Sequence, residues 1–379
     1  MSNKYIPFMD LNQTNSQIKN EIISDFSKMI DESNFISGPE IEMFESEFSK
    51  YTGVRHTVAC SNGTDAITLS LRALSIGTGD VVVTVPNTFI ATVEAINAVG
   101  AEVVFVDVDE EQQTMDPEKL ESFLSNKAKD MSVKAVIPVH LFGQMANMSK
   151  LRQIADKYNI YLIEDSAQAH GAKHNGYGPG YYGDLSTFSF YPGKNLGAFG
   201  DAGAICTNSD KLAKKIKMLS NHGRTKKYEH QILGYNNRMD TLQAVILRHK
   251  LPLLDLKNEM RRKVALEYTK HLKHIQGIRL PKLGDGNEHV YHLFVIRTSN
   301  RDYLISELKK RGVITGIHYP VPLHLQKALS MKNYNLGDFP ITEILAKEIV
   351  SLPLWPEMTT EQVKFVCENI EIIQKGIYG

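Results

Sequence analysis

The sequence predicts an α/β fold: a large domain with a mostly parallel sheet, followed by a smaller α+β domain. From residue 57 onward, short apolar runs alternate with helical ones, and several of these runs are continuously apolar. Continuous apolar runs are typical of parallel strands whose two faces are covered by helices. A chain of 379 residues is also long enough for one large domain and a second, smaller one.

The large domain is expected to span residues 1–250 and to begin with helices. Apolar residues recur at helical spacing from Gln17 to Ile30, and the Gly38-Pro39 break starts a second amphipathic stretch. Further on, residues 241–249 form another helical stretch. Between them, seven runs predict the strands of one sheet: 57–60, 81–85, 103–106, 135–139, 161–163, 187–190 and 202–206.

Residues 251–379 are expected to form the smaller α+β domain. The stretch from Lys250 to Leu272 has the mixed charge of a long helix that carries the chain from one domain to the other. After it, strand-like runs at 290–296 and 313–318 flank a helical stretch at 302–311. Alternation of this kind predicts a compact α+β unit.

The composition argues against several classes of protein. Lysine plus arginine equals aspartate plus glutamate at 43 each, so the chain lacks the basic footprint of a nucleic-acid binder. Cys60, Cys206 and Cys367 are too widely spaced for a metal site or a disulfide framework. We see no signal peptide and no apolar run long enough to span a membrane. A cytoplasmic protein with no bound metal is therefore expected.

Three motifs suggest a ligand site. The first, from Ser61 to Ala66, is a small polar turn between a strand and a helix, where free backbone N–H groups favour a phosphate. The same residues also suit an ordinary helix N-cap. The second motif places Asp165 at the end of an apolar strand. A carboxylate there is able to keep a pyridine nitrogen protonated, although it too suits a helix N-cap.

The third motif places Lys194 just after a strand, in a turn that contains proline and glycine. A lysine that forms a Schiff base needs this restraint and a lowered pKa, whereas a lone lysine is more often a solvated surface residue. Ser189, on the preceding strand, is able to donate its hydroxyl to the same phosphate as the first motif. The order of the three motifs, rather than any one of them, indicates a site for pyridoxal phosphate (PLP).

With these motifs, the chain resembles the DegT/StrS family of nucleotide-sugar aminotransferases, within fold type I, the aspartate-aminotransferase-like fold of PLP enzymes. The resemblance runs from Ile36 to Leu354. The segments that carry it are SNGTDA from Ser61, EDSAQAHG from Glu164, SFYPGKNLGAFGDAG from Ser189 and GYNNRMDTLQA from Gly234.

The resemblance implies a role for each site residue and a homodimer with shared active sites. Three of these residues also have a purely structural interpretation: Phe89 as a core residue, Asn236 as a turn residue and His318 as a structural histidine. The implied roles are Lys194 as Schiff-base lysine and proton carrier, Asp165 at the pyridine nitrogen, Gln168 near the phenolic oxygen, Gly63, Thr64 and Ser189 at the phosphate, Phe89 stacked on the ring, Asn236 at the phosphate of the partner subunit's cofactor, and Arg238, His318 and Tyr319 at the substrate.

The expected reaction transfers an amino group from L-glutamate to a nucleotide-linked keto sugar, with PLP passing through pyridoxamine phosphate (PMP). The stretches GYNNRMDTLQA and TGIHYPVPLHLQ resemble members that act on 3-keto sugars. A dTDP-3-keto-6-deoxyhexose is the leading substrate, before a UDP-linked 3-keto sugar and a 4-keto sugar. A PLP sugar dehydratase, in which histidine replaces the lysine, and a non-enzymatic regulator are alternatives that the presence of Lys194 and Asp165 disfavours.

Overall fold

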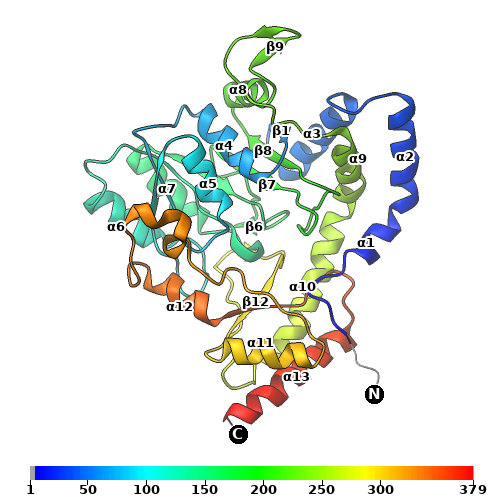
Figure 1. Ribbon diagram of the computed structural model, residues 1–379, viewed down its shortest axis with the longest axis vertical. Helices are drawn as coiled ribbons and strands as arrows, with labels where there is room; N and C mark the ends of the chain where they lie inside the picture. The colour runs from blue at the N-terminus through cyan, green and yellow to red at the C-terminus, as the bar shows by residue number, and fades with distance from the viewer. Residues whose placement is uncertain (1–4, 379) are drawn as a thin grey trace.

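The computed structural model describes residues 5–378 and consists of a broad upper body and a narrower lower part (Figure 1). The upper body is built around one sheet with the strand order β1-β8-β7-β5-β4-β2-β3. β8 runs antiparallel to both of its neighbours, β1 and β7, and the other neighbouring pairs of this sheet are parallel. The prediction of a mostly parallel, seven-stranded sheet is confirmed, since each predicted run overlaps an observed strand. These strands are β1 (His56–Cys60), β2 (Val81–Thr84), β3 (Glu102–Phe105), β4 (Val133–Val136), β5 (Tyr161–Asp165), β7 (Leu185–Ser189) and β8 (Gly203–Thr207).

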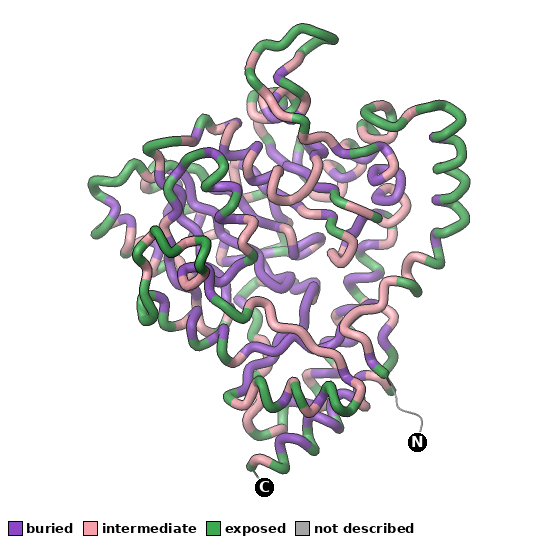
Figure 2. Tube along the Cα trace, viewed as in Figure 1, coloured by how far each residue is buried: buried purple, intermediate pink, exposed green. Residues whose placement is uncertain are grey.

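Helices cover both faces of this sheet. Successive residues of a strand point to opposite faces, and Val82 and Val83 of β2 accordingly belong to two different apolar clusters. The Val82 cluster includes residues of α4 (Gly63–Ala73), α5 (Ala91–Ala98) and α8 (Asp210–Ser220), and the Val83 cluster includes residues of α6 (Pro117–Asn126) and α7 (Met148–Tyr158). This double coverage explains the continuous apolar runs of the sequence, and it appears in Figure 2 as a buried centre.

The N-terminal helices flank the sheet at the right of Figure 1. The predicted helix 17–30 is present, but it is split at Ile18 into α1 (Asn12–Gln17) and α2 (Lys19–Asp31). Pro39 opens α3 (Pro39–Thr52) in its first turn, where its missing N–H costs no hydrogen bond. The predicted helical stretch 241–249 is α9 (Thr241–Lys250).

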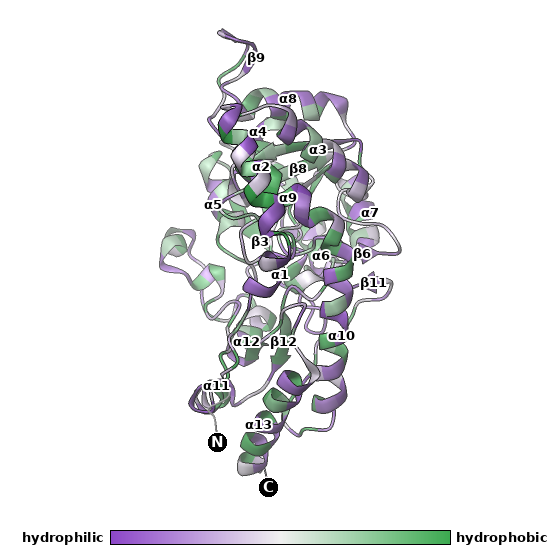
Figure 3. Ribbon diagram, turned by 90° about the vertical axis from the view of Figure 1, so that its right-hand side faces the viewer, coloured by the Kyte–Doolittle hydropathy of each residue, from purple (hydrophilic) through white to green (hydrophobic). Residues whose placement is uncertain are grey.

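The lower part has an apolar core of its own. The core includes Tyr268, Phe294 and Trp355, and Ile6 from the N-terminal segment packs into it. Figure 3 shows α10 and α13 along one side of this part, with hydrophobic and hydrophilic residues in alternation. Its elements are α10 (Leu254–Leu272), β12 (Phe294–Arg297), α11 (Arg301–Lys310), α12 (Pro340–Glu348), β13 (Ile349–Leu352) and α13 (Thr360–Tyr378).

Some predicted boundaries in this region differ from the structure. The long helix begins at Leu254 rather than Lys250, because Pro252 lies in a 3₁₀ turn at Leu251–Leu253. The strand predicted at 290–296 begins only at Phe294. The strand predicted at 313–318 is wrong, since this segment makes only isolated bridges, Val313 to Ile6 and Gly316 to Ser351. The division of the chain at residue 250 stays a prediction.

Short elements complete the described part of the chain. The hairpin of β9 and β10 projects from the upper end (Figure 1) and is largely exposed (Figure 2). None of the helices within residues 5–378 is long and apolar enough to cross a membrane. The short elements are β6 (Lys173–His174), β9 (Arg224–Lys226), β10 (Glu229–His230), β11 (Asn287–Glu288) and the 3₁₀ turns η1 (Leu141–Gly143), η2 (Leu251–Leu253), η3 (Leu323–Leu325) and η4 (Lys327–Lys332).

Candidate active site

A cavity of about 940 Å³ lies at the carboxyl ends of the parallel strands. Ligands in open α/β sheets bind at this edge, and Asp165 and Ser189 are the last residues of β5 and β7. The three motifs of the sequence, which are far apart along the chain, meet here. Nine predicted site residues line the cavity: Gly63, Thr64, Phe89, Asp165, Gln168, Ser189, Lys194, His318 and Tyr319.

The polar turn of the first motif is packed tightly against the end of β7. The Asn62 side chain caps α4 by accepting the Asp65 N–H at 2.8 Å, so the capping interpretation holds for Asn62. Gly63 and Thr64 nonetheless line the cavity. A Cβ atom on Gly63 would lie 2.7 Å from the Cβ of Ser189. Two non-bonded carbon atoms do not approach each other so closely. The turn and Ser189 therefore form a narrow polar cradle that only glycine permits.

Asp165 presents a buried carboxylate to the cavity. Its Oδ2 accepts a hydrogen bond from Thr92 Oγ1 at 2.8 Å, and its Oδ1 accepts one from the Ala167 N–H at 3.3 Å. The segment between β5 and β6 contains no helix, so Asp165 does not cap one. Three residues further on, Gln168 accepts the Phe142 N–H at 2.7 Å and donates to the Tyr319 hydroxyl at 3.3 Å. Both side chains are thereby held toward the cavity.

Lys194 lies in the turn that follows β7, where its N–H donates to the Tyr191 carbonyl at 2.8 Å. The residue as a whole is only partly buried, yet its amine is turned inward. Loss of hydration lowers the pKa of Lys194 to about 8, while the charge of Asp165 acts in the opposite direction. Lys194 is thus not a solvated surface lysine. Such an amine is a nucleophile near neutral pH.

Two aromatic side chains form one wall of the cavity. Phe89 is 55% exposed, so it is not a core residue. Its ring lies 5.7 Å from that of Tyr319, centroid to centroid. Burial, followed by the charge of Asp165, raises the pKa of Tyr319, which keeps its hydroxyl protonated. This wall offers an aromatic face on which a planar ring is able to stack.

His318 lines the cavity, and contacts with Ser351 and Phe8 hold its ring in place. Its Nδ1 lies 2.8 Å from Ser351 Oγ, and its ring stacks on Phe8 at 5.6 Å. Burial and then the charge of Lys194 lower the pKa of His318 to about 4. Burial and Lys194 likewise lower the pKa of His170 to about 3 and that of His292 well below its ordinary value. The imidazoles around the amine are therefore neutral.

Sequence reasoning missed several cavity residues. Thr92 holds Asp165, and Phe8, Met9, Tyr191 and His292 line the walls. Tyr191 lies within the lysine motif and Thr92 three residues after Phe89, whereas Phe8, Met9 and His292 lie far from the recognised motifs. None of the five carries a local pattern that distinguishes it from a core or loop residue. Only the tertiary fold brings them to the site.

Asn236 and Arg238 do not line this cavity. Asn236 is exposed and its backbone pairs with Asn221. Arg238 donates through Nη1 to Asn221 Oδ1 at 3.0 Å. A single chain thus does not bring these two residues to its own site, and their service to a partner subunit stays a prediction.

The residues present fit PLP. The Gly63–Ser189 cradle is suited to hold a phosphate, and the Asp165 carboxylate is suited to bind a protonated pyridine nitrogen. The Phe89 wall is suited to stack on a flat ring, and the Lys194 amine to bond to an aldehyde carbon. No group of three histidine, cysteine, aspartate or glutamate side chains within residues 5–378 is arranged to hold a metal ion.

The fold and the site define the class: an α/β protein of PLP fold type I, with a large sheet domain and a smaller α+β C-terminal domain. Residues 16–371 match the model of the DegT/DnrJ/EryC1/StrS aminotransferase family. The chain belongs to this family.

Several curated relatives are similar over nearly their full length. One, from Aneurinibacillus thermoaerophilus, is a dTDP-3-amino-3,6-dideoxy-alpha-D-galactopyranose transaminase, 44% identical over 96% of this chain and 98% of the relative. A pleiotropic regulatory protein from Geobacillus stearothermophilus is 43% identical over 96% and 97%. A UDP-N-acetyl-3-dehydro-alpha-D-glucosamine 3-aminotransferase from Acidithiobacillus ferrooxidans is 40% identical over 100% and 99%.

Solved structures agree with this assignment. S. venezuelae DesV, in complex with a ketimine intermediate, has a TM-score of 0.94 and 39% identity, covering 98% of this chain and 99% of its own. NtdA from Bacillus subtilis, with the bound cofactor PMP, has a TM-score of 0.88 and 33% identity, covering 97% of this chain and 83% of its own. PLP chemistry is thus the chemistry of this family.

Proposed function

We propose that this protein is a PLP-dependent aminotransferase that transfers the amino group of L-glutamate to a nucleotide-linked keto sugar. The observation that carries the proposal is Lys194, an amine with a pKa of about 8 that shares a cavity with the buried carboxylate of Asp165. When bound, PLP supplies an electron sink that allows a proton to leave the carbon next to the amino nitrogen.

The chain's own residues supply the rest of the chemistry. Asp165 keeps the pyridine nitrogen protonated, and Thr92 and the Ala167 N–H orient its carboxylate. Lys194 carries the proton between the two carbon positions in both halves of the reaction. The neutral histidines do not add positive charge near this amine, which favours its unprotonated form. The same residues would hold the cofactor in both its PLP and its PMP form.

The leading substrate is a dTDP-3-keto-6-deoxyhexose, converted to a dTDP-3-amino-3,6-dideoxyhexose. The 44% identical relative, whose name describes this kind of product, supports this choice. The cavity lining supports it as well, because it contains the apolar side chains of Phe8, Met9 and Leu11. A 6-deoxy sugar is able to bury its methyl group against such a wall.

A UDP-linked 3-keto sugar is the second candidate, because the Acidithiobacillus relative has such a name, and a 4-keto sugar is the third. A regulatory role is kept as an alternative because of the Geobacillus relative. We further propose a cytoplasmic homodimer in which Asn236 and Arg238 of each chain reach the other's site.

The test is an assay with a panel of dTDP- and UDP-linked keto sugars and glutamate, read by mass spectrometry. The visible absorption band of the purified protein is expected to bleach with glutamate and to return with the correct keto sugar. Absence of any glutamate-dependent bleaching would favour the regulatory alternative. Turnover with only a UDP-linked sugar would replace the leading substrate with the second.

A further inference from the structure

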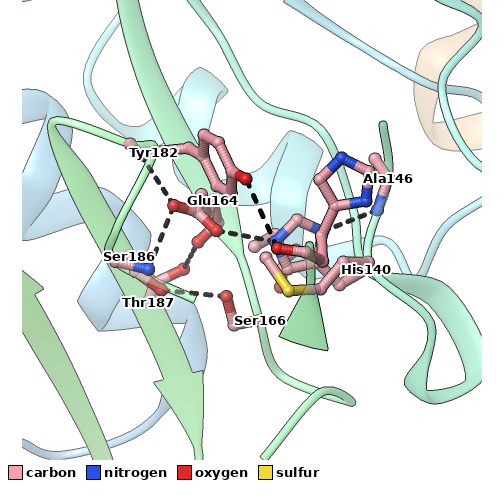
Figure 4. Close-up of polar contacts among 12 residues, drawn as sticks. His140, Ala146, Glu164, Ser166, Tyr182, Ser186 and Thr187 are labelled. Carbon is pink, nitrogen blue, oxygen red and sulfur yellow. Dashed lines mark hydrogen bonds and ion pairs between the residues drawn. The ribbon is translucent and has the colours of Figure 1, made fainter. Parts of the chain in front are cut away.

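Behind the carboxyl end of β5 lies a buried pair, His140 and Glu164. Neither side chain is exposed to solvent, and neither lines the cavity. His140 Nε2 and Glu164 Oε2 are 2.8 Å apart, as Figure 4 shows. A buried ionisable pair carries a desolvation cost, so its presence next to Asp165 calls for a physical reason.

The hydrogen bonds determine the charge state of the pair. The Ala146 N–H donates to His140 Nδ1 at 3.2 Å, so Nδ1 carries a lone pair and the proton of the ring is on Nε2. Nε2–H therefore donates to Glu164 Oε2. The other oxygen, Oε1, accepts the Gly180 N–H at 3.0 Å and the Gly183 N–H at 2.7 Å. Since all three partners are donors, Glu164 is an ionised carboxylate and His140 is neutral.

His140 binds β5 at two successive residues, Glu164 and Asp165. The His140 ring binds the side chain of Glu164, while the His140 backbone N–H donates to the Asp165 carbonyl at 3.0 Å. The Asp165 N–H donates to the Pro138 carbonyl of the same neighbouring segment at 3.0 Å. Because successive side chains of a strand point to opposite faces, fixing Glu164 on the hidden face sets the direction of Asp165 on the cavity face.

The same pair also supports the other cofactor residues. The Ala146-to-His140 bond closes the loop 140–146, and inside this loop the Phe142 N–H orients Gln168 at 2.7 Å. Gly180 and Gly183 precede β7, the strand that ends at Ser189. A Cβ atom on Gly183 would lie 2.9 Å from Glu164 Oε1, so this approach is close. Glu164 thereby ties β5 to the segment that leads to the lysine turn.

We propose that His140 and Glu164 are positioning residues of the cofactor site. By accepting three N–H donors, the ionised Glu164 fixes β5 relative to the loop 140–146 and to the segment that precedes β7. This inference rests on the proposed function, because PLP is the group that Asp165 and Gln168 are oriented to meet. It assigns a role to the two residues without direct contact with the cofactor.

Glu164→Gln tests the proposal. A glutamine has one acceptor oxygen and one NH₂ group, so either His140 Nε2–H or the two glycine N–H groups must face a donor. Such a conflict leaves a buried donor unsatisfied, and we expect the dissociation constant of PLP to rise about ten-fold or more. The pH at which the visible band of the bound cofactor titrates is expected to shift as well, because Asp165 would no longer be held in place.

The matched control is Glu343→Gln. Glu343 accepts from Gly337 N–H at 2.8 Å and Phe339 N–H at 3.3 Å and pairs with the buried His324 at 3.0 Å, but neither member of this pair lines the cavity. Both variants are expected to lower the melting temperature of the apoprotein. Only Glu164→Gln is expected to change PLP affinity and the titration, whereas Glu343→Gln should stay within about two-fold of wild type, as distant sites do.

The proposal is overturned if Glu164→Gln retains wild-type PLP affinity and titration, or if Glu343→Gln changes both to the same extent. If Glu164→Gln does not fold, His140→Gln takes its place. That variant keeps a donor for Glu164 but loses the acceptor for the Ala146 N–H, and the same selective loss of PLP affinity is expected. A wild-type protein that fails to bind PLP at all would instead overturn the proposed function.

Discussion

Gly63 and Ser189 both line the cavity and lie so close together that a Cβ atom on Gly63 would be 2.7 Å from the Cβ of Ser189. Gly63→Ala should therefore push the first turn of α4 away from the end of β7. Overpacking of this kind costs about 1–3 kcal/mol of unfolding free energy, and the displaced cradle should weaken PLP binding. Denaturant unfolding and fluorescence titration with PLP measure the two effects.

Gly376→Ala is the matched control, because a Cβ atom on Gly376 in α13 would meet nothing within 4 Å. It should leave PLP affinity unchanged and stabilise the helix slightly, since alanine favours helices over glycine. Equal PLP affinity in Gly63→Ala and wild type would show that the cradle does not hold the phosphate.

The sequence predicted the sheet well because several of its strands, such as β2 and β8, are buried on both faces and leave continuous apolar runs. The meeting of Asp165 and Lys194 at one cavity was predictable, because Asp165 ends one parallel strand, Lys194 follows the next, and the carboxyl ends of parallel strands share one edge. His140 and Thr92 were not, since their roles depend on contacts with Glu164 and Asp165 across the fold. The segment 313–318 was predicted wrongly as a strand, because an apolar run also suits a segment that makes only isolated bridges.

Lys194→Ala should abolish transamination while the protein still binds PLP. The Gly63–Ser189 cradle and Asp165 contact other parts of the cofactor, so their contributions remain. Turnover is measured with glutamate and the best keto sugar, and binding by equilibrium dialysis. Lys211→Ala, which changes an exposed lysine, is the control and should keep wild-type turnover. Wild-type rates in Lys194→Ala would refute the assignment of the lysine.

The rate at which the apoprotein captures PLP should rise with pH through about 8, the pKa of Lys194. The sign follows from the chemistry: only the unprotonated amine attacks the aldehyde, and the amine loses its proton above this pKa. An ordinary lysine would show this rise near pH 10.4. Stopped-flow absorbance at a series of pH values measures the rate. A profile that rises only near the ordinary lysine pKa would contradict the buried setting of the amine.

The shared site can be tested by mixing two inactive variants. Asn236 is exposed and lies outside the cavity of its own chain. It is therefore able to serve a cofactor only in the site of a partner subunit. Asn236→Asp should be nearly inactive, since a carboxylate repels a phosphate. In a mixed dimer with Lys194→Ala, one site carries both defects and the other carries neither. We therefore expect recovery of about one wild-type site per mixed dimer.

The control pair is Lys194→Ala with Asp165→Asn. Both residues line the same cavity of one chain, so each site of this mixed dimer keeps one defect and no recovery is expected. Subunit exchange is verified by co-purification of differently tagged chains. If exchange occurs and the Asn236→Asp mixture stays inactive, Asn236 serves no partner site. The dimer would then have to rest on burial of apolar surface alone, rather than on a contribution from each chain to the other's cofactor.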